Sequence, residues 1–558
     1  MNASTRTRQL RVRSGDTEHT LPVGAHDATR TLADFLGRHG LPLNTRCGGR
    51  GLCNGCQVQF SRAGDVEARA EKACRLTVAD SLARCTDESV ITIPARSLLR
   101  QRPSVVDDFR LNIPSARDPI DAHAGYGAAV DIGTTTVALL LCDLATGKPL
   151  ARASAFNAQI RHGEDVLTRI ELCSGNPAAV RELQRAIAVE TIQPLLAGAC
   201  ARAGIAPADV GVMVVAGNTV MQHLLAGENP RSLGVHPFTP VFLDHRVYAP
   251  GELGLAFGQN RGDRASSAPA PLVHLLPGLS SYVGADLAAG IIATGLVYEN
   301  GPVLLVDIGT NGEIIAKTDG KLIGCATAAG PAFEGAGLTC GTRAVDAAIQ
   351  RVRLETNPFS IQLGLIGDGN GSVPPVGVCG SGFIDFLWEA RRAGLLLGNG
   401  RYAPQPALPP GACVENGERG GGQGRTFCIS PCGASGPLWI SEMDIVRLLQ
   451  AKAAIAAGIV TLLDVLDIRA TDVKRLYLAG GFGMHLSLEH AIGCGLLPGF
   501  TPGQIQIVGN TSLGGAYLAL NDRALLDEMR ATGAGFHAVE LNRHPGFEDA
   551  YIDNLALP

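Results

Sequence analysis

The chain has 558 residues, 46% of them hydrophobic and 18% charged, with a formal net charge of −5. This composition supplies apolar surface for real cores, and the length suggests three or four domains at roughly 150 residues each. The net charge argues against general nucleic-acid binding. Residues 1–20 lack the apolar core of a signal peptide, and no apolar run approaches about eighteen residues. We therefore expect a cytoplasmic protein without a membrane span.

The N-terminal region has the pattern of a small mixed sheet. Residues 8–24 predict two short strands joined by a turn at Gly15-Asp16, and residues 28–38 carry apolar positions at helical spacing. Further strands are predicted at 56–60 (CQVQF) and 89–95 (SVITIPA). This β–β–α–loop–β order over residues 1–95 indicates a β-grasp domain.

A glycine-rich loop between the helix and the third strand holds three cysteines, Cys47, Cys53 and Cys56, at C-x5-C-x2-C spacing. An iron–sulfur cluster needs thiolates that converge from one loop, with backbone N–H groups directed at its sulfurs. The glycines permit that tight wrap. A structural zinc site also uses C-x2-C but does not need this glycine density. The loop therefore predicts a cluster.

The cysteine loop resembles that of plant- and adrenodoxin-type [2Fe–2S] ferredoxins, which carry a fourth cysteine before their last strand. Two residues here are candidates for it. Cys74 lies in KACRL, and Cys85 lies in SLARC, closer to the final strand. We predict Cys74 as the fourth ligand, with Cys85 as the alternative that the spacing leaves open.

Residues 96–125 have weak periodicity and are predicted to be a linker. From Tyr126 the pattern changes to long apolar strands, each followed by a Gly/Thr turn. The first copy of a hairpin pattern lies within residues 126–215, and a second copy lies at 302–322. The second copy belongs to a larger unit that spans residues 216–558. An internal repeat of this kind indicates two lobes, and we expect 126–558 to form one α/β unit.

Two short motifs share one design. An apolar strand ends in an aspartate suited to Mg²⁺, a glycine tightens the turn, and hydroxyls with successive N–H groups can then face phosphate oxygens. The motifs are DIGTTT at 131–136 and DIGTNG at 307–312. Their candidate phosphate-binding residues are Asp131, Gly133, Thr134, Thr135, Asp307, Gly309, Thr310 and Asn311.

A third motif, LYLAGGFG, breaks an apolar strand into Gly480, Gly481 and Gly483. With the two hairpins it resembles the actin, sugar-kinase and Hsp70 superfamily (ASKHA), whose two lobes bind ATP in the cleft between them. No P-loop motif is present, and no Rossmann fingerprint follows a strand. Asp286 and Glu313 are further candidates for metal or water handling. Phe333-Glu334 is interpreted as packing, with contact to a partner or a nucleotide as the alternative. No catalytic residue is assigned.

The combination resembles the reductive activators of corrinoid proteins. Besides the motifs above, the resemblance rests on these segments: AGNTVMQHLLAG (216–227), SSYVGADLAAG (280–290), FEGAGLTCGTRA (333–344), VCGSGFID (378–385) and GNTSLGGA (509–516). It implies an N-terminal [2Fe–2S] domain, a linker, a middle domain and a C-terminal actin-like domain that commonly forms a homodimer. The implied cofactors are a [2Fe–2S] cluster and ATP with Mg²⁺.

The resemblance implies an enzyme that uses ATP to reduce Co(II) to Co(I) in a corrinoid methyltransferase protein. Its partners would be that protein and a low-potential electron donor; a cobalamin-dependent methionine synthase is one candidate target. A one-electron mismatch of about 59 mV shifts the equilibrium constant tenfold, so a mismatch of a few hundred millivolts requires an energy source. Two alternatives remain. One is a nucleotide-gated scaffold without turnover. The other is a 2-hydroxyacyl-CoA dehydratase activator, which the separate ferredoxin domain argues against.

Overall fold

We describe the protein from a computed structural model of the whole chain. It describes residues 8–558 with the exception of 16, 25, 44, 46–50, 52–55, 62–68, 86–88, 95–96, 98–108, 113–117, 122, 164, 259–269, 368–372, 405–407, 409–413, 417–423 and 435. Cys47 and Cys53 lie outside the described residues.

The N-terminal domain is a five-stranded mixed sheet in the order β2-β1-β5-β3-β4. β1 pairs in parallel with β5, while the other neighbours are antiparallel. The strands predicted at both ends of the domain and after the cysteine loop are confirmed. The bounds are β1 Gln9–Ser14, β2 Thr17–Pro22, β3 Gln57–Ser61, β4 Arg69–Lys72 and β5 Val90–Ile93.

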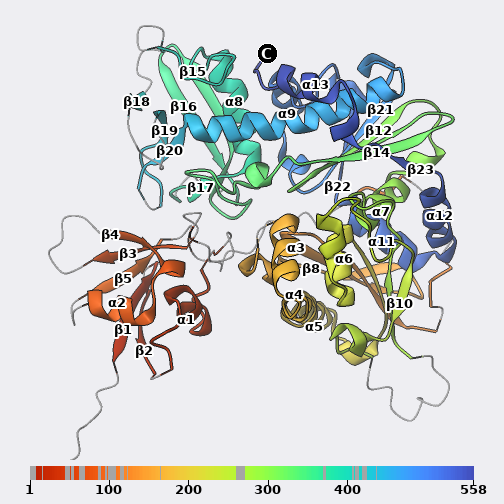
Figure 1. Cartoon of the computed structure of the whole chain (residues 1–558), viewed down its shortest axis with the longest axis horizontal. Coiled ribbons are helices and arrows are strands. Elements are labelled where there is room, and N and C mark those ends of the chain that lie inside the picture. The colour runs from red at the N-terminus through yellow and green to blue at the C-terminus, as the bar shows by residue number, and fades with distance from the viewer. Residues whose placement is uncertain are drawn as a thin grey trace, which may run out of the picture.

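Two helices cover this sheet, α1 (Leu32–Arg38) and α2 (Val78–Arg84). α1 begins four residues later than predicted because the Thr31 hydroxyl caps it, accepting a hydrogen bond from the Asp34 backbone N–H. Neither β4 nor α2 was expected, since the sequence RAEK of β4 has no apolar alternation. Figure 1 shows this domain as a body of its own.

The first lobe is built on a six-stranded sheet in the order β10-β11-β9-β6-β7-β8. β6 and β7 form the hairpin that contains the first DIGT motif. The division expected at 215/216 differs from this arrangement, because it cuts through β9, which is buried along its whole length and joins the same sheet. The bounds are β6 Tyr126–Ile132, β7 Thr136–Asp143, β8 Lys148–Phe156, β9 Val210–Gly217, β10 Arg246–Tyr248 and β11 Leu272–Leu275.

Helices cover both faces of the first sheet. One face packs on a group of four helices and the other on three. The first group is α3 Val166–Gly175, α4 Ala179–Ile187, α5 Gln193–Ala203 and α6 Thr219–Ala226. The second is α7 Ala285–Thr294, α11 Thr511–Asn521 and α12 Arg523–Ala534.

The second lobe repeats the design with a sheet in the order β22-β21-β12-β13-β14-β23. β12 and β13 form the hairpin with the second DIGT motif, which confirms the internal repeat. The bounds are β12 Val303–Ile308, β13 Gly312–Lys317, β14 Leu322–Thr327, β21 Arg475–Ala479, β22 Ile505–Gly509 and β23 Phe536–Ala538.

The long helix α9 (Glu442–Val465) covers one face of the second sheet, and α7 packs on the other. In the part of the chain that the structure describes, α9 alone is long and apolar enough to cross a membrane, but most of it is buried in this core. The remaining helices of this region are α8 Gly380–Arg392, α10 Leu488–Gly493 and α13 Phe547–Asp553.

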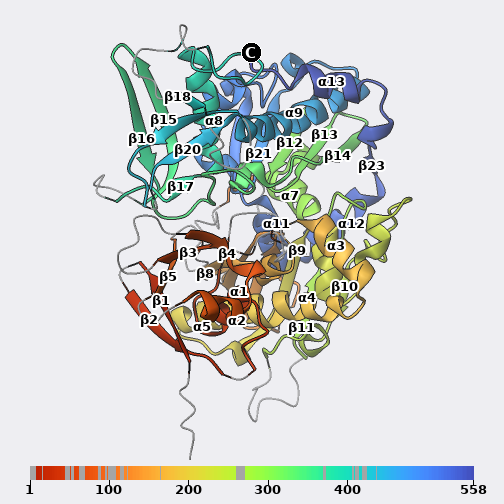
Figure 2. The same cartoon turned by 60° about the vertical axis from the view of Figure 1, so that its left-hand side comes forward.

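Two small sheets extend the second lobe, in the orders β16-β15-β17 and β18-β19-β20 (Figure 2). Phe427, Ile429 and Ile440 of the second small sheet lie in the main core, so this sheet is packed into the second lobe. The bounds are β15 Ala348–Thr356, β16 Phe359–Leu365, β17 Gly377–Val378, β18 Val414–Asn416, β19 Arg425–Ser430 and β20 Leu438–Ser441.

Helices α7 and α11 join the lobes. α7 contributes Ala289 to the core of the first lobe and Ile291 to that of the second. α11 follows β22 of the second sheet, yet it packs on the first sheet together with α12, as Figure 1 shows. The chain therefore crosses back to the first lobe near its end, and this crossing brings residue 510 and its neighbours to the first hairpin.

Part of the segment predicted as a linker is anchored to these helices. The Arg110 backbone N–H donates to Val508, and the Asn112 side chain donates to the Thr294 carbonyl. The Phe109 ring lies against α11. From Phe109 onward the chain is therefore fastened to the two-lobed unit.

Candidate functional site

A cavity of about 230 Å³ lies where the two hairpins meet the glycine loop after β21. The structure brings together the predicted residues of all three motifs, although they are far apart in the sequence. Among the described residues that line the cavity are Asp131, Gly133, Thr134, Thr135, Asp307, Gly309, Thr310, Asn311, Gly480 and Gly481. Gly483 is described too, but it lies beyond the lining.

The tip of the first hairpin is fixed by side chains from three other elements. The buried Arg169 guanidinium of α3 donates to the Thr134 carbonyl at 2.6 Å. Asn157 donates to the Gly133 carbonyl at 2.9 Å, and Asn218 donates to the Thr134 hydroxyl at 3.0 Å. Because these contacts hold the turn from outside, its backbone keeps one conformation. Sequence reasoning missed Arg169 and Asn157; Asn218 stands in the AGNTV segment.

Asp131 is held by the start of α11. The Asn510 amide donates to its Oδ2 at 2.8 Å, and the Ser512 hydroxyl donates to its Oδ1 at 2.7 Å. Burial raises the pKa of Asp131, and these two hydrogen bonds work in the opposite direction. Each oxygen of this carboxylate therefore has a partner within the protein.

Asp307 of the second hairpin has acidic neighbours instead. It stands directly opposite Glu313 in the β12–β13 pair, and like charges at such positions repel. Burial, followed by the charge of Asp131, raises the pKa of Asp307 to about 7. Burial and the neighbouring Asp307 raise the pKa of Asp286 to about 7 as well. The pKa of Glu313 is also raised, mainly by burial and by Asp286.

Such a group of carboxylates favours a cation. Mg²⁺ prefers oxygen ligands and usually keeps several waters, so it binds through one or two carboxylates plus phosphate oxygens. The residues that the structure describes contain no set of three acidic, histidine or cysteine side chains placed to hold one ion directly. This arrangement fits Mg²⁺ held by Asp307 and its neighbours through water and a nucleotide, rather than a closed metal site.

The glycine loop approaches the second hairpin closely. Gly480 has a φ of +90°, and a Cβ there would lie 2.6 Å from the Ile308 carbonyl oxygen. Only glycine fits both requirements. Phe482 in the same loop stacks on Phe333, with ring centroids 5.0 Å apart. The loop is thus seated against the hairpin on one side and against the Phe333 segment on the other.

Glu334 lies in the cleft between the two hairpins, whereas the sequence analysis preferred packing for Phe333-Glu334 over contact with a nucleotide. Its carboxylate accepts hydrogen bonds from Thr135 and Thr310, one from each lobe. Arg343 also lines the cavity, with its guanidinium 4.8 Å from the centre of the Phe156 ring. Both residues lie in the glycine-rich segment FEGAGLTCGTRA, and this glycine density was the signal in the sequence that could have indicated them.

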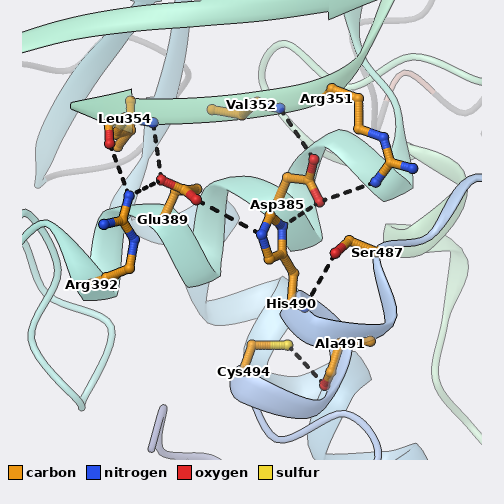
Figure 3. Close-up of polar contacts among 10 residues, drawn as sticks. All are labelled: Arg351, Val352, Leu354, Asp385, Glu389, Arg392, Ser487, His490, Ala491 and Cys494. Carbon is orange, nitrogen blue, oxygen red and sulfur yellow. Dashed lines mark hydrogen bonds and ion pairs between the residues drawn. The ribbon is translucent and has the colours of Figure 1, made fainter. Parts of the chain in front are cut away.

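A second polar network lies outside the cavity and joins α8, whose first residues line the cavity, to α10. Figure 3 shows His490 of α10 between two carboxylates of α8: Asp385 contacts its Nδ1 at 2.7 Å, and Glu389 lies 3.7 Å from its Nε2. Asp385 and Glu389 also accept from the backbone N–H groups of Val352 and Leu354 in β15. Because α8 starts at the cavity wall and α10 follows the glycine loop, this network stabilises both.

In the N-terminal domain, the structure describes Cys56 and both candidates for the fourth ligand, Cys74 and Cys85. The Ala73 backbone N–H donates to the Cys56 carbonyl at 3.1 Å, so the chain next to Cys74 meets the chain at Cys56. Both side chains are buried. Lys72 donates to the Gly51 carbonyl at 2.7 Å, which draws the cysteine loop towards the same turn. Cys85 is the C-cap of α2, where its backbone N–H donates to the Ser81 carbonyl.

Two lobes, each with a hairpin that carries a DIGT motif at a shared cavity, define a protein of the ASKHA class. Sequence models of one family account for both lobes: the middle region of RACo matches residues 126–299, and its C-terminal ASKHA domain matches 301–558. Together they cover most of the chain, which therefore belongs to the RACo family. This confirms the resemblance drawn from the sequence, and the family boundary near residue 300 agrees with the two sheets.

Individual relatives support the assignment. The chain is 28% identical to the corrinoid activation enzyme RamQ of Eubacterium limosum, covering 94% of this chain and 95% of the relative. It is 26% identical to a [Co(II) methylated amine-specific corrinoid protein] reductase of Methanosarcina barkeri, covering 72% and 71%. A solved structure of a reductive activator for corrinoid, iron–sulfur protein matches with a TM-score of 0.69 and 28% identity over 98% of each chain.

Proposed function

We propose that this chain is an ATP-dependent reductive activator that returns a corrinoid methyltransferase protein from Co(II) to Co(I) by transfer of one electron. The observation that carries the proposal is the cavity in which both hairpins, the glycine loop and the acidic residues converge. The relatives named for corrinoid activation and corrinoid reduction support the choice of target. ATP with Mg²⁺ would occupy this cavity, with Asp307 and its acidic neighbours beside the metal.

We further propose that the N-terminal domain is a β-grasp ferredoxin domain whose [2Fe–2S] cluster is held by Cys47, Cys53, Cys56 and Cys74. Support comes from the buried Cys56 and Cys74 and from the contact between their turns. When bound, a cluster supplies a one-electron carrier between an external donor and the corrinoid. Cys74→Ser should abolish the visible absorption of the reconstituted cluster, whereas Cys85→Ser should retain it. The reverse result would identify Cys85 as the fourth ligand.

The reaction is tested with the full chain under anaerobic conditions. A Co(II) corrinoid protein is mixed with this protein, a low-potential reductant and MgATP, and the Co(I) absorption band is followed. Co(I) should form only with ATP, and the corrinoid protein should stimulate ATP hydrolysis. Equal Co(I) formation without nucleotide would refute the role of ATP. Tight ATP binding without stimulated hydrolysis would identify a nucleotide-gated scaffold instead.

A further inference from the structure

Glu334 makes a bridge between the lobes at the place where phosphates would bind. Its Oε2 accepts from the Thr135 hydroxyl at 2.7 Å, and its Oε1 accepts from the Thr310 hydroxyl at 2.9 Å. Thr135 belongs to the first hairpin and Thr310 to the second, and their hydroxyl oxygens are 3.4 Å apart. Both threonines are buried. One carboxylate therefore engages one threonine hydroxyl from each hairpin.

The chemistry of a hydroxyl makes this bridge exclusive. A threonine side chain has a single O–H proton to donate, and a carboxylate and a nucleotide phosphate both present only acceptor oxygens to it. While Thr135 and Thr310 donate to Glu334, neither can donate to a phosphate. Two anionic groups at this distance also repel each other in a partly buried cleft. The Glu334 carboxylate and a phosphate must compete for the same two donors.

The segment that carries Glu334 is tightly connected to its surroundings. It is the 3₁₀ turn Pro331–Glu334, which begins and ends at glycines with positive φ, Gly330 and Gly335. Phe333 stacks on Phe482 of the glycine loop, and its carbonyl lies against Gly380 at the start of α8. A shift of the turn that carries Glu334 would therefore disturb the glycine loop and the start of α8.

We propose that Glu334 is an internal competitor of the nucleotide, which a bound phosphate must displace from Thr135 and Thr310, and that its displacement transmits phosphate binding to the glycine loop through Phe333 and Phe482. The inference rests on the proposed function and adds a regulatory device to the same cavity. It identifies the ligand that acts on Glu334 as the phosphate chain of ATP, as distinct from its adenosine part.

The test compares nucleotide affinities of full-length wild type and Glu334→Gln by calorimetry, with a non-hydrolysable MgATP analogue and with adenosine. Gln keeps the shape but is a weaker, neutral acceptor, so the analogue should bind about five- to tenfold more tightly to the variant. Adenosine should bind both proteins equally. Glu299→Gln is the matched control, because Glu299 accepts from Tyr477 away from the cavity, and it should leave both affinities unchanged.

Equal or weaker binding of the analogue by Glu334→Gln, with wild-type binding intact, would overturn this inference alone. A wild-type protein that does not bind the analogue would refute the proposed function itself. A second measurement needs no variant: in wild type, the analogue should change hydrogen–deuterium exchange at residues 331–337 and 480–485, whereas adenosine should leave 331–337 unchanged. Identical exchange at 331–337 with and without the analogue would also overturn the inference.

Discussion

The two hairpins have nearly the same sequence but opposite electrostatic surroundings. Asp131 in the first hairpin receives hydrogen bonds from Asn510 and Ser512, so its charge is satisfied by the protein. Asp307 in the second hairpin faces Glu313 across the strand pair, and burial, followed by the charge of Asp131, raises the pKa of Asp307 to about 7. The motif therefore determines the conformation of the turn, whereas the residues packed around it determine the electrostatic environment of its aspartate. The first aspartate is hydrogen-bonded to the start of α11, whereas the second lies among other acidic side chains.

The largest expected effect comes from Asp307→Asn, which should lower the activity and raise the free energy of unfolding. If Asp307 acts on Mg²⁺ and the phosphates, corrinoid-stimulated ATP hydrolysis should fall by about 100-fold or more in kcat. At pH 8 the same change removes a buried charge beside acidic neighbours, so the free energy of unfolding should rise by about 1 kcal/mol. Steady-state kinetics and urea denaturation measure the two effects. A variant that loses stability would contradict this account of the second hairpin.

Asp385 serves as the reference for a buried carboxylate outside the nucleotide cavity. Asp385→Ala leaves His490 and the Val352 backbone N–H without this partner, which should lower the free energy of unfolding by about 3 kcal/mol. Trp388, whose ring centroid lies 6.3 Å from that of His490, reports the transition by fluorescence in urea. The affinity for ATP should stay within about twofold of wild type at temperatures where the variant is folded. A large change in ATP affinity at full folding would mean that the network acts on nucleotide binding directly.

Asp131→Asn should shift stability in the direction opposite to Asp307→Asn. An amide cannot accept equally well from both Asn510 and Ser512, so the free energy of unfolding should fall by about 1–2 kcal/mol. Ser512→Ala removes one of the two hydrogen bonds and should cost less than Asp131→Asn. Urea denaturation of the three proteins side by side provides the measurement. A higher free energy of unfolding for Asp131→Asn than for wild type would contradict the proposed difference between the two hairpins.

The pH dependence of Mg²⁺ binding provides a further test of the second hairpin. The pKa values of Asp307 and Asp286 are raised from 3.8 to about 7, so the folded state keeps protons that the unfolded state has already lost. Their contribution to stability is present below about pH 4 and is lost as the pH rises through 7. Mg²⁺ needs the ionised form, so its affinity should increase between pH 6 and 8, by at most about tenfold per pH unit for each proton released. Calorimetry at pH 6, 7 and 8 tests this, and Asp307→Asn should flatten the profile.

The three motifs could be predicted from the sequence because each consists of adjacent residues. The two hairpins and the glycine loop appear as an apolar strand followed by a defined turn, and all three reach the cavity. The strand β4 was missed because its four residues are polar, and its place in the sheet comes from pairing with β3. The boundary predicted at 215/216 lies within β9, because strand order within a sheet is not visible in local periodicity.

By itself, the sequence determined the turn chemistry, the cysteine loop, the repeat of the hairpin and the family. Only the tertiary structure decided how the two aspartates differ. Asn510 lies 379 positions from Asp131, and it reaches that residue because the chain returns to the first lobe through α11. Glu334 joins Thr135 across 199 positions for a similar reason, since the hairpins of two separate sheets converge on one cavity. Such contacts depend on how lobes pack, and packing joins residues that no local pattern connects.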